Sequence, residues 1–202
     1  MSYTIETIAE RIGARRVGDA SATIDWLLTD SRSLSFPEET LFFALATKRN
    51  DGARYIPDLY SRGVRNFVVT QETLKAIDNG QLTIDNSMQR DGTQPIVNCQ
   101  LSMVNFLVVS DPLKALQKLA EQHREQFQIP VIGITGSNGK TIVKEWLHQL
   151  LSPERVIVRS PRSYNSQIGV PLSVWQMNEQ SELAIFEAGI SEMGEMRALQ
   201  NI

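Results

Sequence analysis

The residues best suited to chemistry form a glycine-rich turn, Thr135-Gly136-Ser137-Asn138-Gly139-Lys140-Thr141. The turn follows a short apolar run at 131–134 and precedes a segment of helical spacing at about 140–151. Glycines allow several backbone N–H groups to converge on an anion, and the following helix adds the partial positive charge of its N-terminus. Lys140 is placed to neutralise outer phosphates, and Thr141 to offer a hydroxyl to Mg²⁺. The seven residues therefore predict an ATP-binding loop in which Lys140 is also catalytic.

The turn is shorter than the full phosphate-loop pattern G-x-x-x-x-G-K-[ST], because Ile134 stands where the first glycine would fall. A glycine turn followed by a solvated lysine is the alternative interpretation of the shorter form. The strand expected before the turn, the helix expected after it and the Gly-Lys-Thr ending favour nucleotide binding.

A second feature is Glu187, which ends another apolar run at 183–186. A carboxylate at the C-terminal end of a neighbouring parallel strand lies where Mg²⁺ on a triphosphate needs an oxygen ligand. We therefore predict that Glu187 is catalytic and shares a metal ion with Thr141. Glu192 and Glu195 follow in a turn rich in Gly and Met, and either could reach the metal or face water.

Between these features lies the segment Asn165-Ser166-Gln167-Ile168-Gly169-Val170-Pro171. Its amide side chains are hydrogen-bonding groups without charge. Taken alone, the segment is typical of a loop that enters a helix. His123 and His148 lie on expected helices, where a structural role is favoured, and neither is predicted to be catalytic.

These residues lie where strands and helices alternate along the chain. The expected strands are 106–109, 131–134, 156–158 and 183–186, and the expected helices are 112–126 and 140–151. Such alternation predicts an α/β fold whose parallel sheet is covered on both faces and binds ligands beyond the C-terminal strand ends.

The chain before residue 106 has shorter, mixed segments. We expect helices at 4–13 and 56–61 and strands at 24–29, 41–45 and 66–70, and assign no structure to 78–94. The sequence thus predicts two domains. Residues 1–105 form a small α/β domain, and residues 106–202 form the first part of a P-loop-type parallel-sheet ATPase domain, which is incomplete.

Composition excludes several classes of protein. The 202 residues include 20 Lys and Arg against 23 Asp and Glu, a net charge of −3 that gives no general attraction to nucleic acid or to an anionic membrane. A single cysteine, Cys99, excludes an internal disulfide and a multi-cysteine metal site. The apolar runs are far shorter than the ~20 residues that span a bilayer. We therefore expect no nucleic acid partner, no membrane insertion and a cytoplasmic location.

Three segments in order, 135–141, 165–171 and 187–195, carry a family resemblance. They resemble the signature segments of the Mur ligases, the ATP-dependent amide ligases of peptidoglycan synthesis. The segments Thr29-Asp30-Ser31-Arg32 and Leu41-Phe42-Phe43-Ala44-Leu45 resemble parts of the N-terminal domain of the same family. The resemblance covers nearly the whole chain and is weakest between about 71 and 104.

The resemblance implies a reaction and its participants. ATP phosphorylates the terminal carboxylate of a UDP-N-acetylmuramoyl-tripeptide, and the amine of D-alanyl-D-alanine then attacks the acyl phosphate. Residues 1–105 would bind the UDP-sugar peptide, with Ser31 and Arg32 at its uridine end, and Asn165 would contact it near the reacting centre. Glu192 stands in a segment where many relatives have a histidine ligand of a second metal, so it is expected to bind Mg²⁺.

Three alternatives remain open at this point. One is another Mur or folylpolyglutamate-type ligase, although the segments 29–32 and 41–45 disfavour the folate branch. A P-loop phosphotransferase is the second, and it would not need the N-terminal region. The third is a nucleotide-binding module without catalysis. Family members continue past residue 202 into a C-terminal domain that receives D-alanyl-D-alanine, so we expect this chain to be a fragment without ligase activity.

Overall fold

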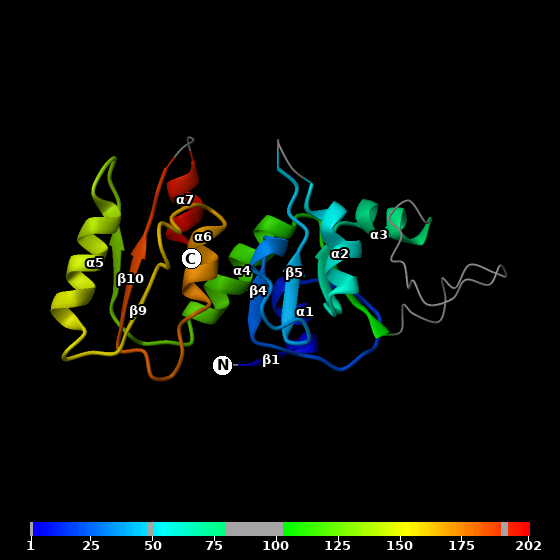
Figure 1. Cartoon of the computed structure of the whole chain (residues 1–202), viewed down its shortest axis with the longest axis horizontal. Helices are drawn as coiled ribbons and strands as arrows, with labels where there is room; N and C mark the ends of the chain where they lie inside the picture. Colours follow the sequence, from blue (N-terminus) through cyan, green and yellow to red (C-terminus); the bar gives the residue numbers. More distant parts are fainter. Residues whose placement is uncertain (1, 48–50, 80–102, 191–193) are drawn as a thin grey trace. The chain divides into compact units, whose positions relative to one another are not determined.

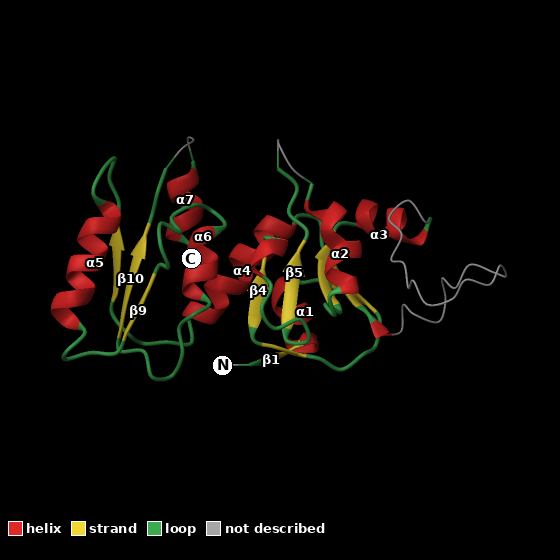
Figure 2. Cartoon of the chain, viewed as in Figure 1, coloured by secondary structure: helices red, strands yellow, loops and turns green. Residues whose placement is uncertain are grey.

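The computed structural model describes residues 2–47, 51–79, 103–190 and 194–202, and the chain divides into two units, 2–115 and 116–202. Each unit contains a sheet with helices beside it (Figure 1, Figure 2). The expected α/β class is confirmed. Within the described ranges, every helix is too short or too polar to cross a lipid bilayer.

The N-terminal unit is built on a five-stranded sheet in the order β2-β7-β6-β5-β4. Its strands are β2 (Arg15–Val17), β4 (Trp26–Leu28), β5 (Thr40–Phe43), β6 (Asn66–Val69) and β7 (Asn105–Val108). Strands β4 to β7 are parallel, and β2 pairs antiparallel with β7. Every residue of β5, β6 and β7 is buried, as expected where both faces of parallel strands are covered.

Short helices and one antiparallel pair of two-residue strands complete this unit. They are β1 (Tyr3–Thr4) with β3 (Thr23–Ile24), α1 (Ile5–Ile12), α2 (Ile56–Ser61), α3 (Gln71–Asp78) and the 3₁₀ helices η1 (Ser31–Ser33) and η2 (Gly52–Tyr55). The strand expected at 24–29 is thus interrupted at Asp25. The Asp25 and Trp26 N–H groups both donate to the carbonyl of Glu39, which turns the chain from one sheet into the next.

The domain boundary expected after residue 105 is wrong. The apolar run that was expected to open the second domain is β7, which pairs with β6 and β2 inside the N-terminal sheet. Buried amides fix its register, since Asn105 Nδ2 donates to Asn66 Oδ1 at 2.8 Å. The division between units falls instead inside α4 (Pro112–Arg124). Strand pairing decides to which sheet a strand belongs, and a single apolar run does not reveal its pairing partners.

The C-terminal unit has a three-stranded parallel sheet in the order β8-β10-β9. Its elements are β8 (Val131–Ile134), α5 (Lys140–Leu151), β9 (Ile157–Arg159), α6 (Gly169–Val174), β10 (Leu183–Glu187) and α7 (Glu195–Gln200). The central strand, β10, is buried along its whole length. Figure 1 shows α5 on one side of the sheet and α6 on the other. The core on the α6 side contains Ala120, Val170, Val174, Met177, Ala184, Phe186, Leu199 and Ile202.

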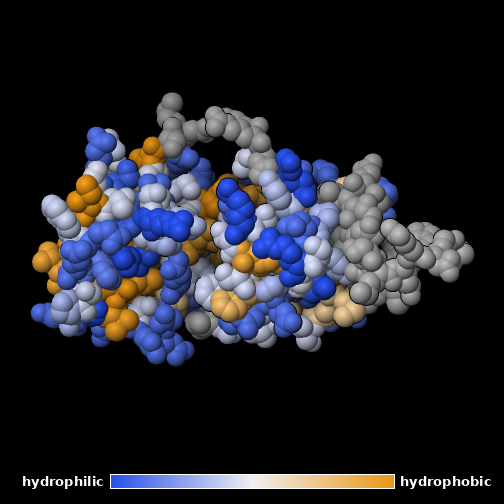
Figure 3. Space-filling view, in the orientation of Figure 1, coloured by the Kyte–Doolittle hydropathy of each residue, from blue (hydrophilic) through white to orange (hydrophobic). Residues whose placement is uncertain are grey.

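The outer face of α5 is apolar and exposed. Ile142, Val143, Trp146 and Leu150 are 57%, 44%, 64% and 74% exposed. Figure 3 shows apolar residues on the surface around α5. The inner face of the same helix carries the polar residues of the candidate site.

Candidate nucleotide and metal site

The glycine-rich turn connects β8 directly to the N-terminus of α5. Gly136 and Gly139 have φ angles of +135° and +77°, which side chains rarely adopt. A Cβ at Gly139 would meet no atom within 4 Å, so conformation rather than crowding requires glycine there. The turn is exposed, and the α5 N-terminus opens onto it. This arrangement leaves backbone N–H groups free to face an anion.

Lys140 is the first residue of α5 and folds back over the turn. Its Nζ donates to the carbonyl of Gly136 at 2.6 Å. The residue is half-buried, and its hydrogen bond to Gly136 is exposed to solvent. An arriving phosphate could therefore take this hydrogen bond in place of the carbonyl.

Thr141 and Glu187 meet although 46 residues separate them. The Thr141 hydroxyl donates to Glu187 Oε2 at 3.1 Å. Glu187 is the last residue of β10 and is fully buried, and its backbone pairs with Ile134, the last residue of β8. Parallel pairing therefore brings the carboxylate to the sheet edge where the glycine-rich turn begins.

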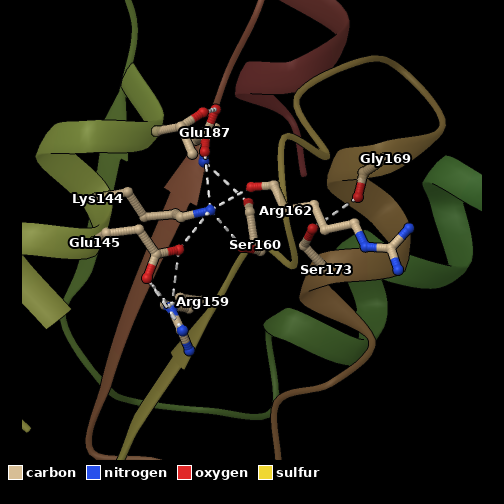
Figure 4. A network of polar contacts seen from close by, with 9 residues as sticks. Lys144, Glu145, Arg159, Ser160, Arg162, Gly169, Ser173 and Glu187 are labelled. Carbon is tan, nitrogen blue, oxygen red and sulfur yellow. Dashed lines mark hydrogen bonds and ion pairs between the residues drawn. The ribbon is translucent and has the colours of Figure 1, made fainter. Parts of the chain in front are cut away.

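Lys144 is a central residue of this site that the sequence reasoning missed. Its side chain is fully buried, and Nζ lies 2.9 Å from Glu187 Oε1 (Figure 4). Nζ also donates to the carbonyl of Ser160 at 2.8 Å and to that of Arg162. Its position four residues after Lys140, one helical turn along the same face, was a signal that could have identified it.

Glu145 and Arg159 form the outer part of the same network. Glu145 Oε1 lies 3.3 Å from Lys144 Nζ, and Glu145 Oε2 lies 3.1 Å from Arg159 Nη2. The hydrogen bond from Arg159 is the main reason that the pKa of Glu145 is lowered. Glu145 is therefore an anion on the outer side of the buried lysine.

Asn165 lies beside the residues that follow Glu187. Its carbonyl accepts from the Gly189 N–H at 2.7 Å. Glu195, the other acidic residue of the turn, accepts from Gln167 Nε2 at 3.0 Å, whereas Glu192 lies outside the described residues. The structure thus brings Asn165 close to the end of β10 and engages Glu195 in a side-chain hydrogen bond.

We expect Gly189→Ala to displace the Asn165 side chain. A Cβ at Gly189 would lie 2.9 Å from Asn165 Cγ, closer than real Cβ contacts. The clash involves only the end of the partly exposed Asn165 side chain, which can rotate away, so we expect little loss of stability. The side-chain amide resonances of Asn165 should shift in NMR spectra.

Gly133→Ala is the matched control, because a Cβ there meets nothing within 4 Å. It should leave the Asn165 resonances in place. Unshifted Asn165 resonances in Gly189→Ala would contradict the packing argument.

Ser31 and Arg32, the residues expected at the uridine end, lie in the N-terminal unit. Asp30 caps the short helix η1, because its Oδ1 accepts from the Arg32 N–H at 3.1 Å. The Arg32 guanidinium is exposed and pairs with Asp30 Oδ2 at 2.6 Å. Ser31 is buried, and its carbonyl accepts from Arg62 at 2.8 Å. Two arginines thus lie beside Ser31.

The pair of Asp30 and Arg32 has a testable pH dependence. Hydrogen bonds from Arg32 lower the pKa of Asp30 below its ordinary value of 3.8. A lowered pKa means that the interaction is present above the unfolded-state pKa and is lost as pH falls through the folded-state pKa. An NMR titration of the Asp30 carboxylate should give a midpoint below 3.8, and Arg32→Gln should raise it. An equal midpoint in both proteins would refute the coupling.

The donor atoms at the end of β10 suit Mg²⁺. Thr141 and Glu187 offer only oxygen, and Mg²⁺ commonly uses one or two protein oxygens together with substrate phosphates. Among the residues that the structure describes, no cluster of three or more His, Cys, Asp or Glu side chains could hold a metal alone. A nucleotide would therefore complete the coordination shell.

The fold is α/β, and a glycine-rich turn joins β8 to the N-terminus of α5. Residues 134–202 match the family model of the Mur ligase middle domain. This match confirms the family resemblance seen in the sequence.

Curated relatives extend the likeness to the whole chain. The chain is 31% identical to the UDP-N-acetylmuramoyl-tripeptide--D-alanyl-D-alanine ligase of Treponema pallidum, covering 100% of this chain and 41% of the relative. It is 27% identical to the enzyme of the same name from Bacillus subtilis, covering 98% and 38%. The chain thus spans about two fifths of the length of these relatives.

Solved structures share the fold. The D-alanyl-D-alanyl ligase of Acinetobacter baumannii superposes with a TM-score of 0.76 at 23% identity, covering 98% of this chain and 39% of that one. The MurF ligase of Thermotoga maritima, solved with ADP, gives a TM-score of 0.59 at 24% identity, covering 86% and 34%.

Proposed function

We propose that this chain supplies the nucleotide-binding and UDP-substrate-binding parts of an ATP-dependent amide ligase of peptidoglycan synthesis. The ligase would join D-alanyl-D-alanine to UDP-N-acetylmuramoyl-tripeptide, the reaction named for the curated relatives. The observation that carries the proposal is the 3.1 Å contact of Thr141 with Glu187 at the N-terminus of α5, beside Lys140.

The proposed reaction has two balanced steps. A carboxylate oxygen of the tripeptide attacks the γ-phosphorus of ATP, and ADP leaves. The amine of D-alanyl-D-alanine then attacks the acyl carbon, phosphate leaves, and the nitrogen loses a proton as the amide forms. The first step brings two anions together, so catalysis rests mainly on positioning and charge neutralisation.

The residues of the C-terminal unit suit the first step. Lys140 and the N-terminus of α5 would supply positive charge to the phosphates, and residues 135–139 would wrap them with backbone N–H groups. Thr141 and Glu187 would hold Mg²⁺, which when bound neutralises the phosphate oxygens. Asn165, beside the end of β10, would contact the substrate near the reacting carboxylate.

The N-terminal unit would bind the UDP end of the substrate. Ser31 and Arg32 are the proposed contacts. The guanidinium of Arg32 is exposed, and guanidinium groups bind phosphate oxygens in a bidentate manner. Arg62, which holds the Ser31 carbonyl, would keep the short helix η1 in place.

Thermal unfolding in the presence of each ligand tests the proposal. Both MgATP and UDP-N-acetylmuramoyl-tripeptide should raise the Tm of the chain, because ligands that bind only the folded state stabilise it. Arg32→Ala should weaken the effect of the UDP ligand and spare that of MgATP. Stabilisation by MgATP alone would favour the phosphotransferase alternative, and stabilisation by neither ligand would refute the proposal.

A further inference from the structure

The buried ammonium of Lys144 is held among oxygens from two other parts of the C-terminal unit. Lys144 comes from α5, Glu187 ends β10, and the carbonyls of Ser160 and Arg162 follow β9 (Figure 4). An ammonium is strongly hydrated in water, so its burial is tolerated only with several partners. The side chain is 0% exposed, which means that these oxygens replace its water.

The two oxygens of Glu187 face different groups. Oε1 lies 2.9 Å from Lys144 Nζ, and Oε2 accepts from the Thr141 hydroxyl at 3.1 Å. Among the described residues, no hydrogen bond to Oε1 supplements this ion pair. Lys144 therefore occupies one carboxylate oxygen and leaves the other directed toward the phosphate-binding turn.

The backbone around Glu187 is tied to the same lysine. The Glu187 N–H donates to Ser160 Oγ at 3.0 Å, while the Ser160 carbonyl accepts from Lys144. Arg162, the next carbonyl partner, is the one residue other than glycine with a positive φ, +52°, in the described parts of the chain. One ammonium thus fixes both the side chain of Glu187 and the loop that supports its backbone.

We propose that Lys144 is a positioning residue of the metal site, which holds Glu187 so that Oε2 alone faces the cation and the nucleotide. This inference rests on the proposed function, because it assigns Glu187 to Mg²⁺. Groups that orient a metal ligand usually change metal affinity or activity by about 10–100-fold when removed. Lys144 acts through Glu187 and does not itself contact the metal or the phosphates.

The test measures how much Mg²⁺ contributes to ATP binding by the complete chain. Isothermal titration gives the Kd for ATP in EDTA and in excess Mg²⁺, and the ratio of the two is the readout. We expect Lys144→Met to reduce this ratio about tenfold, at the lower end of the effect of removing a group that orients a metal ligand. The affinity in EDTA should be unchanged, whereas general structural damage would weaken both affinities together.

Two further variants sharpen the result. Glu145→Gln neutralises the other carboxylate near the ammonium, 3.3 Å away, and should retain the wild-type ratio. Lys144→Arg keeps the positive charge and should restore part of the ratio that Lys144→Met loses. If Lys144→Met does not fold, Lys144→Gln, which retains hydrogen-bond donors, replaces it. An unchanged ratio, or an equal fall of both affinities, overturns the proposal.

Amide hydrogen exchange separates this inference from the proposed function. Lys144→Met should speed exchange at Glu187, whose N–H is bonded to Ser160 Oγ, more than at Ala184 in the same strand, whose N–H is bonded to Pro130. A wild-type chain that binds no ATP refutes the proposed function, and exchange then decides the role of Lys144. Acceleration at Glu187 that does not exceed that at Ala184, the reference for general loss of stability, would show that Lys144 does not position Glu187.

Discussion

Replacing Lys144 with methionine lowers the free energy of unfolding of the C-terminal unit by about 3–5 kcal/mol, the usual cost of removing one partner of a buried ion pair. The variant leaves the Glu187 carboxylate fully buried, with Oε1 deprived of its cation. It also removes the donor to the carbonyls of Ser160 and Arg162. Urea denaturation followed by tryptophan fluorescence measures the change, since Trp175 is buried in this unit and reports its unfolding.

The control for this prediction removes both charges. Lys144→Met combined with Glu187→Gln should recover most of the lost stability, because an uncharged pair avoids the buried, uncompensated carboxylate. Lys118→Met, an exposed lysine on α4, should change stability by no more than about 0.5 kcal/mol. A Lys144→Met variant as stable as Lys118→Met would show that the buried pair is not what stabilises the unit.

Replacing Lys140 with alanine weakens ATP binding by about 10–100-fold, because hydrogen bonds to charged groups contribute about 1.5–3 kcal/mol. In the structure Nζ donates to the carbonyl of Gly136 at 2.6 Å, a position from which it can transfer to a phosphate. The side chain is half-buried at the start of α5, so we expect stability to be nearly unchanged. Isothermal titration with ATP in Mg²⁺ measures the effect.

Lys118→Ala provides the matched control for charge. It removes an exposed lysine from another helix of the same unit and should retain the wild-type affinity. Lys140→Arg should bind ATP with intermediate affinity, because it preserves the charge but not the compact ammonium. Equal affinity of Lys140→Ala and Lys118→Ala would remove Lys140 from the nucleotide site.

Much of the local structure could be predicted from the sequence. The helix expected at 140–151 has those bounds in the structure, and the strand expected at 131–134 is β8. Both depend on short-range signals: an apolar run, two glycines and a helical spacing. The strand expected at 106–109 was also found, shifted by one residue, but in the wrong domain, because its partners β6 and β2 are distant in the sequence.

The candidate site was predictable only in part. Thr141 and Glu187 were predicted together because parallel strands present their C-terminal ends at one edge, and the structure places them in contact. Lys144 was missed because a lysine on an amphipathic helix usually faces water. Its burial depends on oxygens contributed by residues after β9 and at the end of β10, which no local pattern reveals.

The sequence by itself determined the glycine-rich turn. Gly136 and Gly139 are free to take positive φ angles, and Lys140 and Thr141 then begin a helix, all through interactions among near neighbours. Only the tertiary structure decided which acid and which lysine complete the site. Pairing of β10 with β8 carries Glu187 to the turn, and burying that carboxylate without water requires the one ammonium, that of Lys144, which the fold places beside it.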